Sequence, residues 1–426
     1  MASGLLLAAP SSGSGKTMIT LGVLRALRDK KLPVRAAKSG PDYIDPRFHL
    51  AACGSCVNLD AWAMGPDRIR ALAAAPGTLI VEGAMGLFDG APPDGDGSSA
   101  HLAKVLNVPV VLIIDAAHMA GSVAALAEGF ARHDPAVQVA GIILNKVGSP
   151  RHEAMLRHAL APLGLPILGA VPRTPDLALP SRHLGLVQAG EHADLEAFIA
   201  GAAQLAAQHI DLEALIGLAS PIPAGQPHRI PPPGQRIAVA HDQAFAFVYP
   251  HLLADWQAQG AEISVFSPLA DEGPDHADFV YLPGGYPELH AARLSGNRTF
   301  TQKMRKAAQT AVIYGECGGY MVLGQGLTDG AGETHQMLGL LHLETSFAAR
   351  KLHLGYRHLS AAEGPLKGRW MGHEFHYATT LRANGTPLFT ATDAEGNTLM
   401  PMGLIQGRFM GSFAHLIDLA PDASQA

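Results

Sequence analysis

Two short stretches of the sequence combine residue types that could carry out chemistry. The first, Ala9–Thr17, reads Ala-Pro-Ser-Ser-Gly-Ser-Gly-Lys-Thr and lies between an apolar run and a helical pattern. A turn built on Gly13 and Gly15 presents backbone N–H groups and a helix N-terminus to an anion. Lys16 is expected to reach the outer phosphates, and the Thr17 hydroxyl to bind Mg²⁺. This pattern predicts a nucleoside triphosphate site, although proline stands where the strict motif has its first glycine. The alternative is a turn that only caps a helix.

The second stretch surrounds a cysteine in the other half of the chain. Gly315–Tyr320 reads Gly-Glu-Cys-Gly-Gly-Tyr and lies between an apolar run and a helical pattern. Small residues tolerate a strained backbone around a nucleophile, and a helix N-terminus favours the thiolate of Cys317. Another expected strand ends in Pro-Gly-Gly-Tyr, so the backbone N–H groups of Gly285 and Gly318 could form an oxyanion hole. The alternative for a lone cysteine is an inert core residue.

Charged side chains follow the expected strands of the first half. Lys38 and Glu82 each come directly after a short apolar run, and Asp42 and Asp45 follow Lys38 closely. Ligands of parallel sheets bind at the carboxyl ends of the strands. Any of the three carboxylates could bind Mg²⁺, or could be a turn cap or a surface charge. Lys38 could stabilise a transferring phosphoryl group, or could be a solvated lysine.

The elements that must position these residues are predicted by hydrophobic pattern. The strands expected in the first half are Leu5–Ala8, Val34–Ala37, Thr78–Val81, Val110–Asp115, Ala140–Leu144 and Ile167–Val171. Such runs, separated by helices, predict a parallel sheet covered on both faces. Six prolines between Ser220 and Gly234 exclude a helix or a central strand there. We therefore predict two α/β domains, 1–219 and 236–426, joined by a linker at 220–235.

The composition excludes several classes of protein. The chain has 426 residues, 48% hydrophobic and 16% charged, with a formal net charge of −6 and no basic block. This balance argues against binding to nucleic acid. We find no apolar run near 18 residues, which argues against a membrane span, and no basic region typical of a signal peptide. Three cysteines do not form a disulfide framework, so a cytoplasmic location is expected.

The motifs of the first half resemble those of the cobyrinic and hydrogenobyrinic acid a,c-diamide synthases. The resemblance rests on Ser11–Thr17, Lys38–Pro46, Asn58–Trp62, Glu82–Gly90, Leu144–Ser149 and Arg182–Val187. The N-terminal half of that family is similar to dethiobiotin synthetase, which uses ATP to activate a carboxylate. The resemblance implies ATP and Mg²⁺ as cofactors. It implies ATP, metal or phosphoryl-transfer roles for Lys16, Thr17, Lys38, Asp45 and Glu82, and an adenine contact for Asn145.

The second half resembles a class I glutamine amidotransferase domain, which has a flavodoxin-like fold. This resemblance implies that Cys317 forms a glutamyl thioester and releases ammonia, with His415 as the base. The usual triad has glutamate two residues after its histidine, where this chain has Ile417. The third member is therefore absent or supplied from elsewhere, a departure shared by the cobyrinic-type glutaminase domains.

Together the two resemblances imply ATP- and glutamine-dependent amidation of the a and c carboxylates of a corrinoid in cobalamin biosynthesis. The corrinoid is hydrogenobyrinate, which lacks cobalt, or cobyrinate, which contains it. The sequence of the glycine-rich loop is closer to that of the enzymes that act on hydrogenobyrinate. Two alternatives are cobyric acid synthase-type amidation of other side chains, and a P-loop ATPase switch with an inactive glutaminase-like module. The resemblance leaves open whether the protein is a homodimer.

Two further groups of residues could bind a metal ion or the substrate. His373 and His376 flank Glu374 at i and i+3, whereas a zinc protease helix has histidines at i and i+4. The surrounding residues favour a strand, so zinc hydrolysis is not expected. Five basic residues could bind a polycarboxylated substrate or be solvated: Arg182, His183, Arg350, His353 and Arg357.

Overall fold

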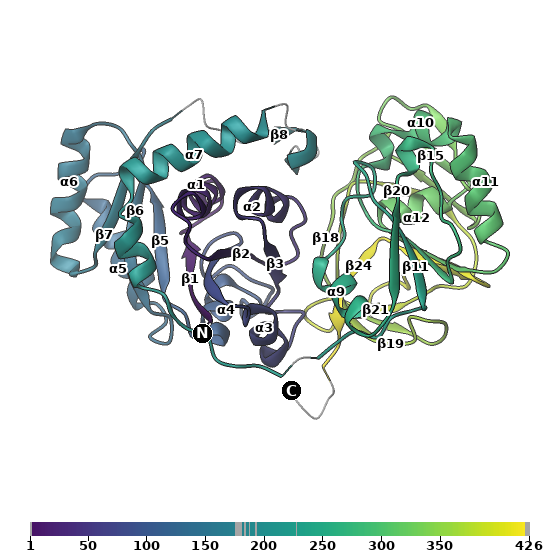
Figure 1. Ribbon diagram of the computed structural model, residues 1–426, viewed down its shortest axis with the longest axis horizontal. Helices are drawn as coiled ribbons and strands as arrows, with labels where there is room; N and C mark the ends of the chain where they lie inside the picture. Colours follow the sequence, from purple (N-terminus) through teal and green to yellow (C-terminus); the bar gives the residue numbers. More distant parts are fainter. Residues whose placement is uncertain are drawn as a thin grey trace. The chain divides into compact units, whose positions relative to one another are not determined.

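The computed structural model describes residues 2–174, 181–182, 185–186, 188–191, 194–226 and 228–421. The chain divides into two compact units, Met1–His228 and Arg229–Ala426, and both are α/β, as the sequence predicts (Figure 1). The division falls inside the proposed linker, 220–235. Within the described ranges, no helix is long and apolar enough to cross a membrane.

The first unit is built on an eight-stranded sheet whose central strand is β1. The strands follow the order β3 (Cys56–Leu59), β2 (Val34–Ser39), β4 (Gly77–Glu82), β1 (Ala2–Ala8), β5 (Val110–Asp115), β6 (Val139–Val147) and β7 (Ile167–Pro172). These seven strands are parallel, and the two-residue strand β10 (Ser220–Pro221) pairs antiparallel with β1. A separate two-stranded pair is formed by β8 (Ser181–Arg182) and β9 (Gly185–Leu186). All six strands expected in this half are confirmed.

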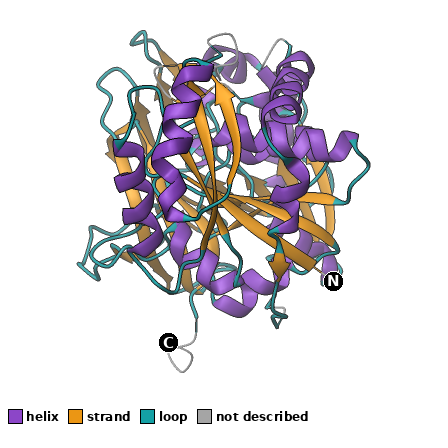
Figure 2. Ribbon diagram, turned by 90° about the vertical axis from the view of Figure 1, so that its left-hand side faces the viewer, coloured by secondary structure: helices purple, strands orange, loops and turns teal. Residues whose placement is uncertain are grey.

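Helices cover both sides of this sheet, which Figure 2 shows by colour. The helices are α1 (Lys16–Asp29), α2 (Asp45–Cys53), α3 (Pro66–Ala73), α4 (Ser99–Leu106), α5 (Ser122–Arg132), α6 (Pro150–Leu160), α7 (Leu195–His209) and α8 (Leu212–Gly217), with 3₁₀ turns at Ala161–Leu163 and Ala189–Glu191. The apolar stripe of α1, including Ile19, Val23, Leu24 and Leu27, is buried against β1 and α7. Burial of this stripe fixes the helix whose first residues are Lys16 and Thr17.

The edge strand β3 was not expected from the sequence, and neither were the two-residue strands β8, β9 and β10. Cys56–Leu59 pairs with β2 at the edge of the sheet, where the hydrophobic pattern predicted no strand. The run is four residues long and contains an asparagine, so its local strand signal is weak. Pairing with a neighbouring strand outweighs this weak propensity.

The second unit contains a six-stranded sheet with the order β12 (Glu262–Phe266), β11 (Arg236–Ala240), β13 (Phe279–Leu282), β14 (Val312–Glu316), β23 (Phe409–Ser412) and β22 (Leu404–Gln406). The first five strands are parallel, and only β22 is antiparallel to its neighbour. In chain order these five strands are arranged 2-1-3-4-5, which is the flavodoxin-like order. The flavodoxin-like fold is therefore confirmed.

Two smaller sheets account for the strand-rich remainder of this unit. One has the order β16 (Thr334–Gln336), β15 (Gly326–Thr328), β17 (Leu343–Ser346) and β20 (Thr379–Ala383). The other has the order β21 (Thr390–Thr392), β18 (His353–Ala361), β19 (Gly368–His376) and β24 (Ala414–Leu419). The helices are α9 (Pro250–Ala258), α10 (Ala291–Gly296), α11 (Arg298–Ala307) and α12 (Gly318–Leu323), with 3₁₀ turns at Pro268–Ala270 and Pro287–Leu289.

Candidate active sites

The glycine-rich loop of the first unit connects the end of β1 to the start of α1. Gly13 and Gly15 have φ angles of 79° and 88°, a left-handed conformation that glycine adopts without strain. A Cβ atom on Gly15 would also collide with the side-chain amide of Asn145. That amide donates to the backbone oxygen of Ser14 at 2.8 Å. Asn145 is 1% exposed, and in this structure it supports the loop; its adenine contact stays a prediction.

Lys16 is held close to the loop by backbone carbonyl groups. Its Nζ donates to the backbone oxygen of Met85 at 2.6 Å and to that of Ser11 at 3.2 Å. Burial lowers the pKa of Lys16, and the negative charges of Glu82 and Asp45 offset part of this decrease. The Lys16 ammonium is thus held beside the loop by two carbonyl oxygens. Phosphate oxygens are stronger acceptors for an ammonium than carbonyl oxygens, so ATP would compete for it.

Four of the predicted site residues form one buried network beside this loop. The Lys38 Nζ donates to Asp45 Oδ2 at 2.6 Å and to Glu82 Oε1 at 2.7 Å. The Thr17 hydroxyl donates to Glu82 Oε1 at 2.7 Å and lies 3.4 Å from Asp45 Oδ2. Asp42 is further out, 3.7 Å from the Lys38 Nζ. The structure thus brings together Thr17, Lys38, Asp45 and Glu82 from two strand ends and two helix starts.

Charge balance differs between the two buried carboxylates of this network. Burial and the neighbouring charge of Asp42 raise the pKa of Asp45 to about 7. Burial also acts to raise the pKa of Glu82, but Lys38 and His49 outweigh it and hold this pKa below its usual range. Burial acts to lower the pKa of Lys38, but Asp45 and Glu82 raise it well above its ordinary value. One ammonium faces several carboxylates, so the negative charge of the network would favour binding of a further cation.

The same residues fit a magnesium ion by their chemistry. Asp45 Oδ1 is buried and has no hydrogen-bond partner among the residues that the structure describes. An unsatisfied carboxylate oxygen beside a second carboxylate and a hydroxyl is the type of donor set that Mg²⁺ prefers. Thr17, Asp45 and Glu82 therefore remain the candidate metal ligands.

His49 belongs to this network, although the sequence analysis did not single it out. It is fully buried on α2, and its Nε2 lies 2.7 Å from Glu82 Oε2. Cys56 Sγ lies 3.8 Å from the other ring nitrogen. His49 follows Asp45 by four residues, so both lie on one helix face, and this spacing was a signal that could have identified it.

In the second unit, Cys317 lies at a sharp turn between β14 and α12. Its φ of 46° and ψ of −102° are strained for a residue with a side chain, as expected of a nucleophile elbow. The turn is held by the Cys317 N–H, which donates to the backbone oxygen of Ser412 at 2.8 Å. A Cβ atom on Gly319 would collide with the backbone of Leu282, so glycine is required by the close approach of the start of α12 to the end of β13.

The predicted base and oxyanion-hole residues lie around this cysteine. A Cβ atom placed on Gly284 would lie 3.3 Å from Cys317 Cβ and 3.3 Å from His415 Nε2, so the thiol and the imidazole meet beside this glycine. A Cβ atom on Gly318 would lie 3.1 Å from the backbone nitrogen of Gly285, which places the two backbones side by side. The structure therefore brings together all four of Cys317, His415, Gly285 and Gly318, and their roles stay predictions.

The environment of Cys317 disfavours a free thiolate. Burial, followed by the charge of Glu288, raises the pKa of the Cys317 thiol, and the N–H of Gly318 only partly opposes this rise. His415 is 1% exposed, and the ring of His373 stacks on it with centroids 4.9 Å apart. The thiol therefore needs an adjacent base to lose its proton.

Glu316 is a second residue that the sequence analysis missed. It is the last residue of β14 and is 1% exposed. One carboxylate oxygen accepts from the Tyr314 hydroxyl at 3.0 Å and from the Leu416 N–H at 3.2 Å, and the other accepts from the Tyr281 hydroxyl at 2.6 Å. The latter oxygen also lies 3.7 Å from His415 Nδ1.

The histidine-rich stretch 373–376 differs in secondary structure from a zinc protease site. His373 and His376 lie on strand β19, which confirms the expected strand and excludes the helix that a zinc protease motif requires. Potential ligand atoms of His353, Glu374 and His376 lie within 4.8 Å of one another. However, Glu374 accepts from Arg357 at 2.8 Å and lies 2.9 Å from His376 Nε2, so its charge already has partners. Of the other candidates for substrate binding, His183 and the side chain of Arg182 lie outside the described residues.

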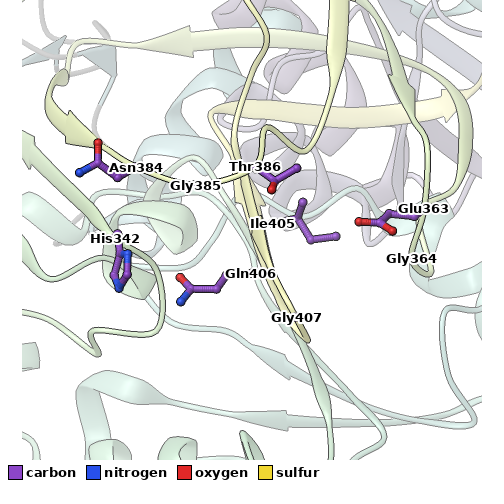
Figure 3. A pocket seen from close by; sticks show the side chains of 9 residues that line it. All are labelled: His342, Glu363, Gly364, Asn384, Gly385, Thr386, Ile405, Gln406 and Gly407. Carbon is purple, nitrogen blue, oxygen red and sulfur yellow. The ribbon is translucent and has the colours of Figure 1, made fainter.

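A cavity in the second unit is separate from these centres. It has a volume of about 570 Å³, and its lining includes no residue of either predicted site (Figure 3). The lining residues are His342, Glu363, Gly364, Asn384, Gly385, Thr386, Ile405, Gln406 and Gly407. The lining has one acidic group, one histidine and several glycines, and it lacks the clustered charges of the two predicted sites.

Comparisons with known proteins agree with both halves of this description. Residues 5–187 match the CobQ/CobB/MinD/ParA nucleotide binding domain, and residues 236–423 match the CobB/CobQ-like glutamine amidotransferase domain. A hydrogenobyrinate a,c-diamide synthase of Rhizobium meliloti (strain 1021) is 54% identical, over 98% of this chain and 99% of its own. One of Brucella abortus biovar 1 (strain 9-941) is also 54% identical, over 99% of this chain and 100% of its own. This chain belongs to the hydrogenobyrinate a,c-diamide synthase family.

Proposed function

We propose that this protein amidates the a and c carboxylates of hydrogenobyrinate in cobalamin biosynthesis, using ATP and glutamine. The observation that supports this most strongly is the pairing of two complementary sites on one chain. The first unit has a phosphate-binding loop beside a buried network of lysine and carboxylates. The second has a cysteine at a strained turn beside a buried histidine. The names of the full-length relatives favour the metal-free corrinoid over cobyrinate.

The first step is activation of the corrinoid carboxylate in the first unit. A carboxylate is a poor acyl donor because oxide is a poor leaving group. Its oxygen attacks the γ-phosphorus of ATP, the bond to the β-phosphate oxygen breaks, and an acyl phosphate and ADP form. Lys16 and Lys38 supply positive charge to the phosphoryl oxygens during transfer. Mg²⁺, held by Thr17, Asp45 and Glu82, would neutralise charge on the ATP phosphates when bound.

The second step supplies ammonia in the second unit. His415 takes the thiol proton of Cys317, and the thiolate attacks the side-chain amide carbon of glutamine. The N–H groups of Gly285 and Gly318 stabilise the oxyanion, and His415 returns the proton to the leaving ammonia. Water then hydrolyses the glutamyl thioester. Ammonia attacks the acyl carbon of the activated corrinoid, and phosphate leaves as the amide forms. A cytoplasmic location stays a prediction.

The direct test is product analysis with purified protein. Incubation with ATP, Mg²⁺, glutamine and hydrogenobyrinate is expected to convert two carboxyl groups to amides, with ADP and glutamate formed in step. Mass spectrometry counts the amides, and fragmentation or NMR locates them at side chains a and c. A parallel incubation with cobyrinate tests the choice of corrinoid.

Three results would contradict the proposal. Amides at other side chains would favour the cobyric acid synthase-type reaction. ATP hydrolysis that is independent of any corrinoid would favour the P-loop switch. Faster conversion of cobyrinate than of hydrogenobyrinate would overturn the assignment of the metal-free substrate while leaving the reaction type intact.

A further inference from the structure

We propose that Glu316 is the missing third member of the glutaminase site, where its buried carboxylate orients His415 and balances the positive charge that His415 gains. This inference rests on the proposed function of Cys317 and His415. The position that usually carries the glutamate is occupied by Ile417, an apolar and fully buried side chain. A carboxylate from the nucleophile strand instead lies 3.7 Å from His415 Nδ1.

The first argument is geometric. His415 Nε2 lies beside the same glycine as Cys317, so Nδ1 is the nitrogen that an orienting group would contact. Glu316 lies beside that nitrogen. It also accepts from the backbone N–H of Leu416, the residue directly after His415, at 3.2 Å. A single carboxylate thus contacts the backbone beside the imidazole and faces the ring itself.

The second argument concerns how firmly Glu316 is held. The hydroxyls of Tyr281 and Tyr314 donate to it at 2.6 Å and 3.0 Å, and their rings stack with centroids 5.8 Å apart. Burial, with the nearby charge of Glu316, raises the pKa of both hydroxyls well above its usual value, so they remain donors. Because both of its oxygens accept hydrogen bonds from the tyrosines, the carboxylate of Glu316 is held in position.

The third argument concerns the surroundings of this carboxylate. Glu316 also lines a small cavity of about 80 Å³ with mainly apolar walls, including Trp256, Phe279 and Trp370. In such surroundings the attraction between a carboxylate and an imidazolium is much stronger than in water. The titratable groups that face this pair are His373, stacked on His415, together with Tyr281, Tyr314 and Cys317.

The chemistry explains why this position suits the reaction. When Cys317 loses its proton, His415 becomes positively charged, and a fixed negative charge at Nδ1 stabilises that state. Because Glu316 directly precedes Cys317, one strand end carries both the nucleophile and the group that supports its base. The substitution of the usual glutamate by Ile417 is therefore compensated from another strand.

The test is the Glu316→Gln variant, which keeps the shape and one acceptor oxygen, replaces the other oxygen by an amide nitrogen, and removes the charge. We expect the kcat for glutamine hydrolysis to fall by roughly 10²- to 10³-fold, with KM for glutamine changed by less than about threefold. The acid limb of the pH profile of kcat/KM is expected to move to lower pH, because protonated His415 loses its counter-charge. Glu316→Asp is expected to recover part of the rate.

Controls separate this role from a structural one. Tyr281→Phe removes one donor and is expected to cost only about three- to tenfold in kcat. Asp278→Asn removes an exposed carboxylate of the same unit and should leave glutamine hydrolysis unchanged. Ammonia-dependent amidation depends on the first unit, so it should be retained in Glu316→Gln, and its loss together with a lowered melting temperature would indicate misfolding.

The outcomes distinguish this inference from the proposed function. If Glu316→Gln hydrolyses glutamine as fast as wild type, or loses rate without any shift of the acid limb, the role of Glu316 is refuted while the synthase activity stands. If the wild-type protein makes no amide from either glutamine or ammonia, the proposed function itself fails.

Discussion

Replacement of Cys317 by serine is expected to abolish glutamine-dependent amidation while ammonia-dependent amidation continues at nearly the wild-type rate. The serine hydroxyl is a far weaker nucleophile than a thiolate, and the site is built to activate a thiol through His415. We expect a loss of at least about 10³-fold in glutamine hydrolysis. The carboxylate-activating residues of the first unit are untouched, so ammonium salts at alkaline pH should still supply the amide nitrogen.

The measurement compares corrinoid amides formed with glutamine and with ammonium chloride, with glutamate release followed separately. Cys53→Ser is the matched control, because Cys53 is a partly buried thiol of the first unit whose Sγ donates to the backbone of Ser55. This control should retain both activities. If a folded Cys317→Ser protein loses the ammonia-dependent reaction, this would contradict the assignment of glutamine hydrolysis to the second unit and of carboxylate activation to the first.

Much of the fold could be predicted because its main signals are local. Runs such as Val110–Ile114 and Ile167–Val171 carry no polar side chain, as expected of strands buried on both faces, and each lies in a strand of the structure. The edge strand Cys56–Leu59 was missed for the same reason, since its stability comes from pairing with β2 rather than from its own residues. The short sheets of the second unit were expected only as a strand-rich region, because pairings such as β19 with β24 join distant segments.

Some residues of the candidate sites could likewise be predicted from local sequence, whereas others could not. Lys16, Thr17 and Cys317 lie in motifs whose spacing carries a mechanism. Lys38 and Glu82 lie at the ends of two paired strands. Glu316 has no such signal, and His49 has only its spacing of four residues from Asp45. Their main contacts are with His415 and Glu82, which are distant in sequence. Glu316 was also obscured by its position, since a residue beside a nucleophile is readily taken as part of the turn. Only the tertiary structure reveals which charges face each other.

Lys38→Met is the second variant for which we expect a large effect. It should reduce glutamine- and ammonia-dependent amidation equally, by roughly 10²- to 10³-fold, because carboxylate activation precedes the use of ammonia from either source. Product formation with each nitrogen source, measured side by side, checks this. A variant that loses only the glutamine-dependent reaction would contradict the assignment of Lys38 to phosphoryl transfer.

The same variant tests how the buried network is balanced. Without the Lys38 ammonium, Asp45 and Glu82 lose the partner that donates to both of them at 2.6 Å and 2.7 Å. Breaking a buried ion pair costs roughly 3–5 kcal/mol in the free energy of unfolding, less whatever Asp45 recovers by taking up a proton. Thermal and urea unfolding of the variant should therefore show a clear destabilisation in the absence of Mg²⁺.

Mg²⁺ should restore part of this loss if Thr17, Asp45 and Glu82 are its ligands. In wild type the cation competes with the Lys38 ammonium for the same two carboxylates, whereas in the variant that competitor is absent. Binding to the folded state alone raises stability with ligand concentration, so the rise in melting temperature on adding Mg²⁺ should be larger for Lys38→Met than for wild type. Lys104→Met, which breaks the more exposed pair with Asp134, should respond to Mg²⁺ as wild type does. An equal response of wild type and Lys38→Met would place the metal elsewhere, because a cation at these carboxylates must sense the loss of the ammonium between them.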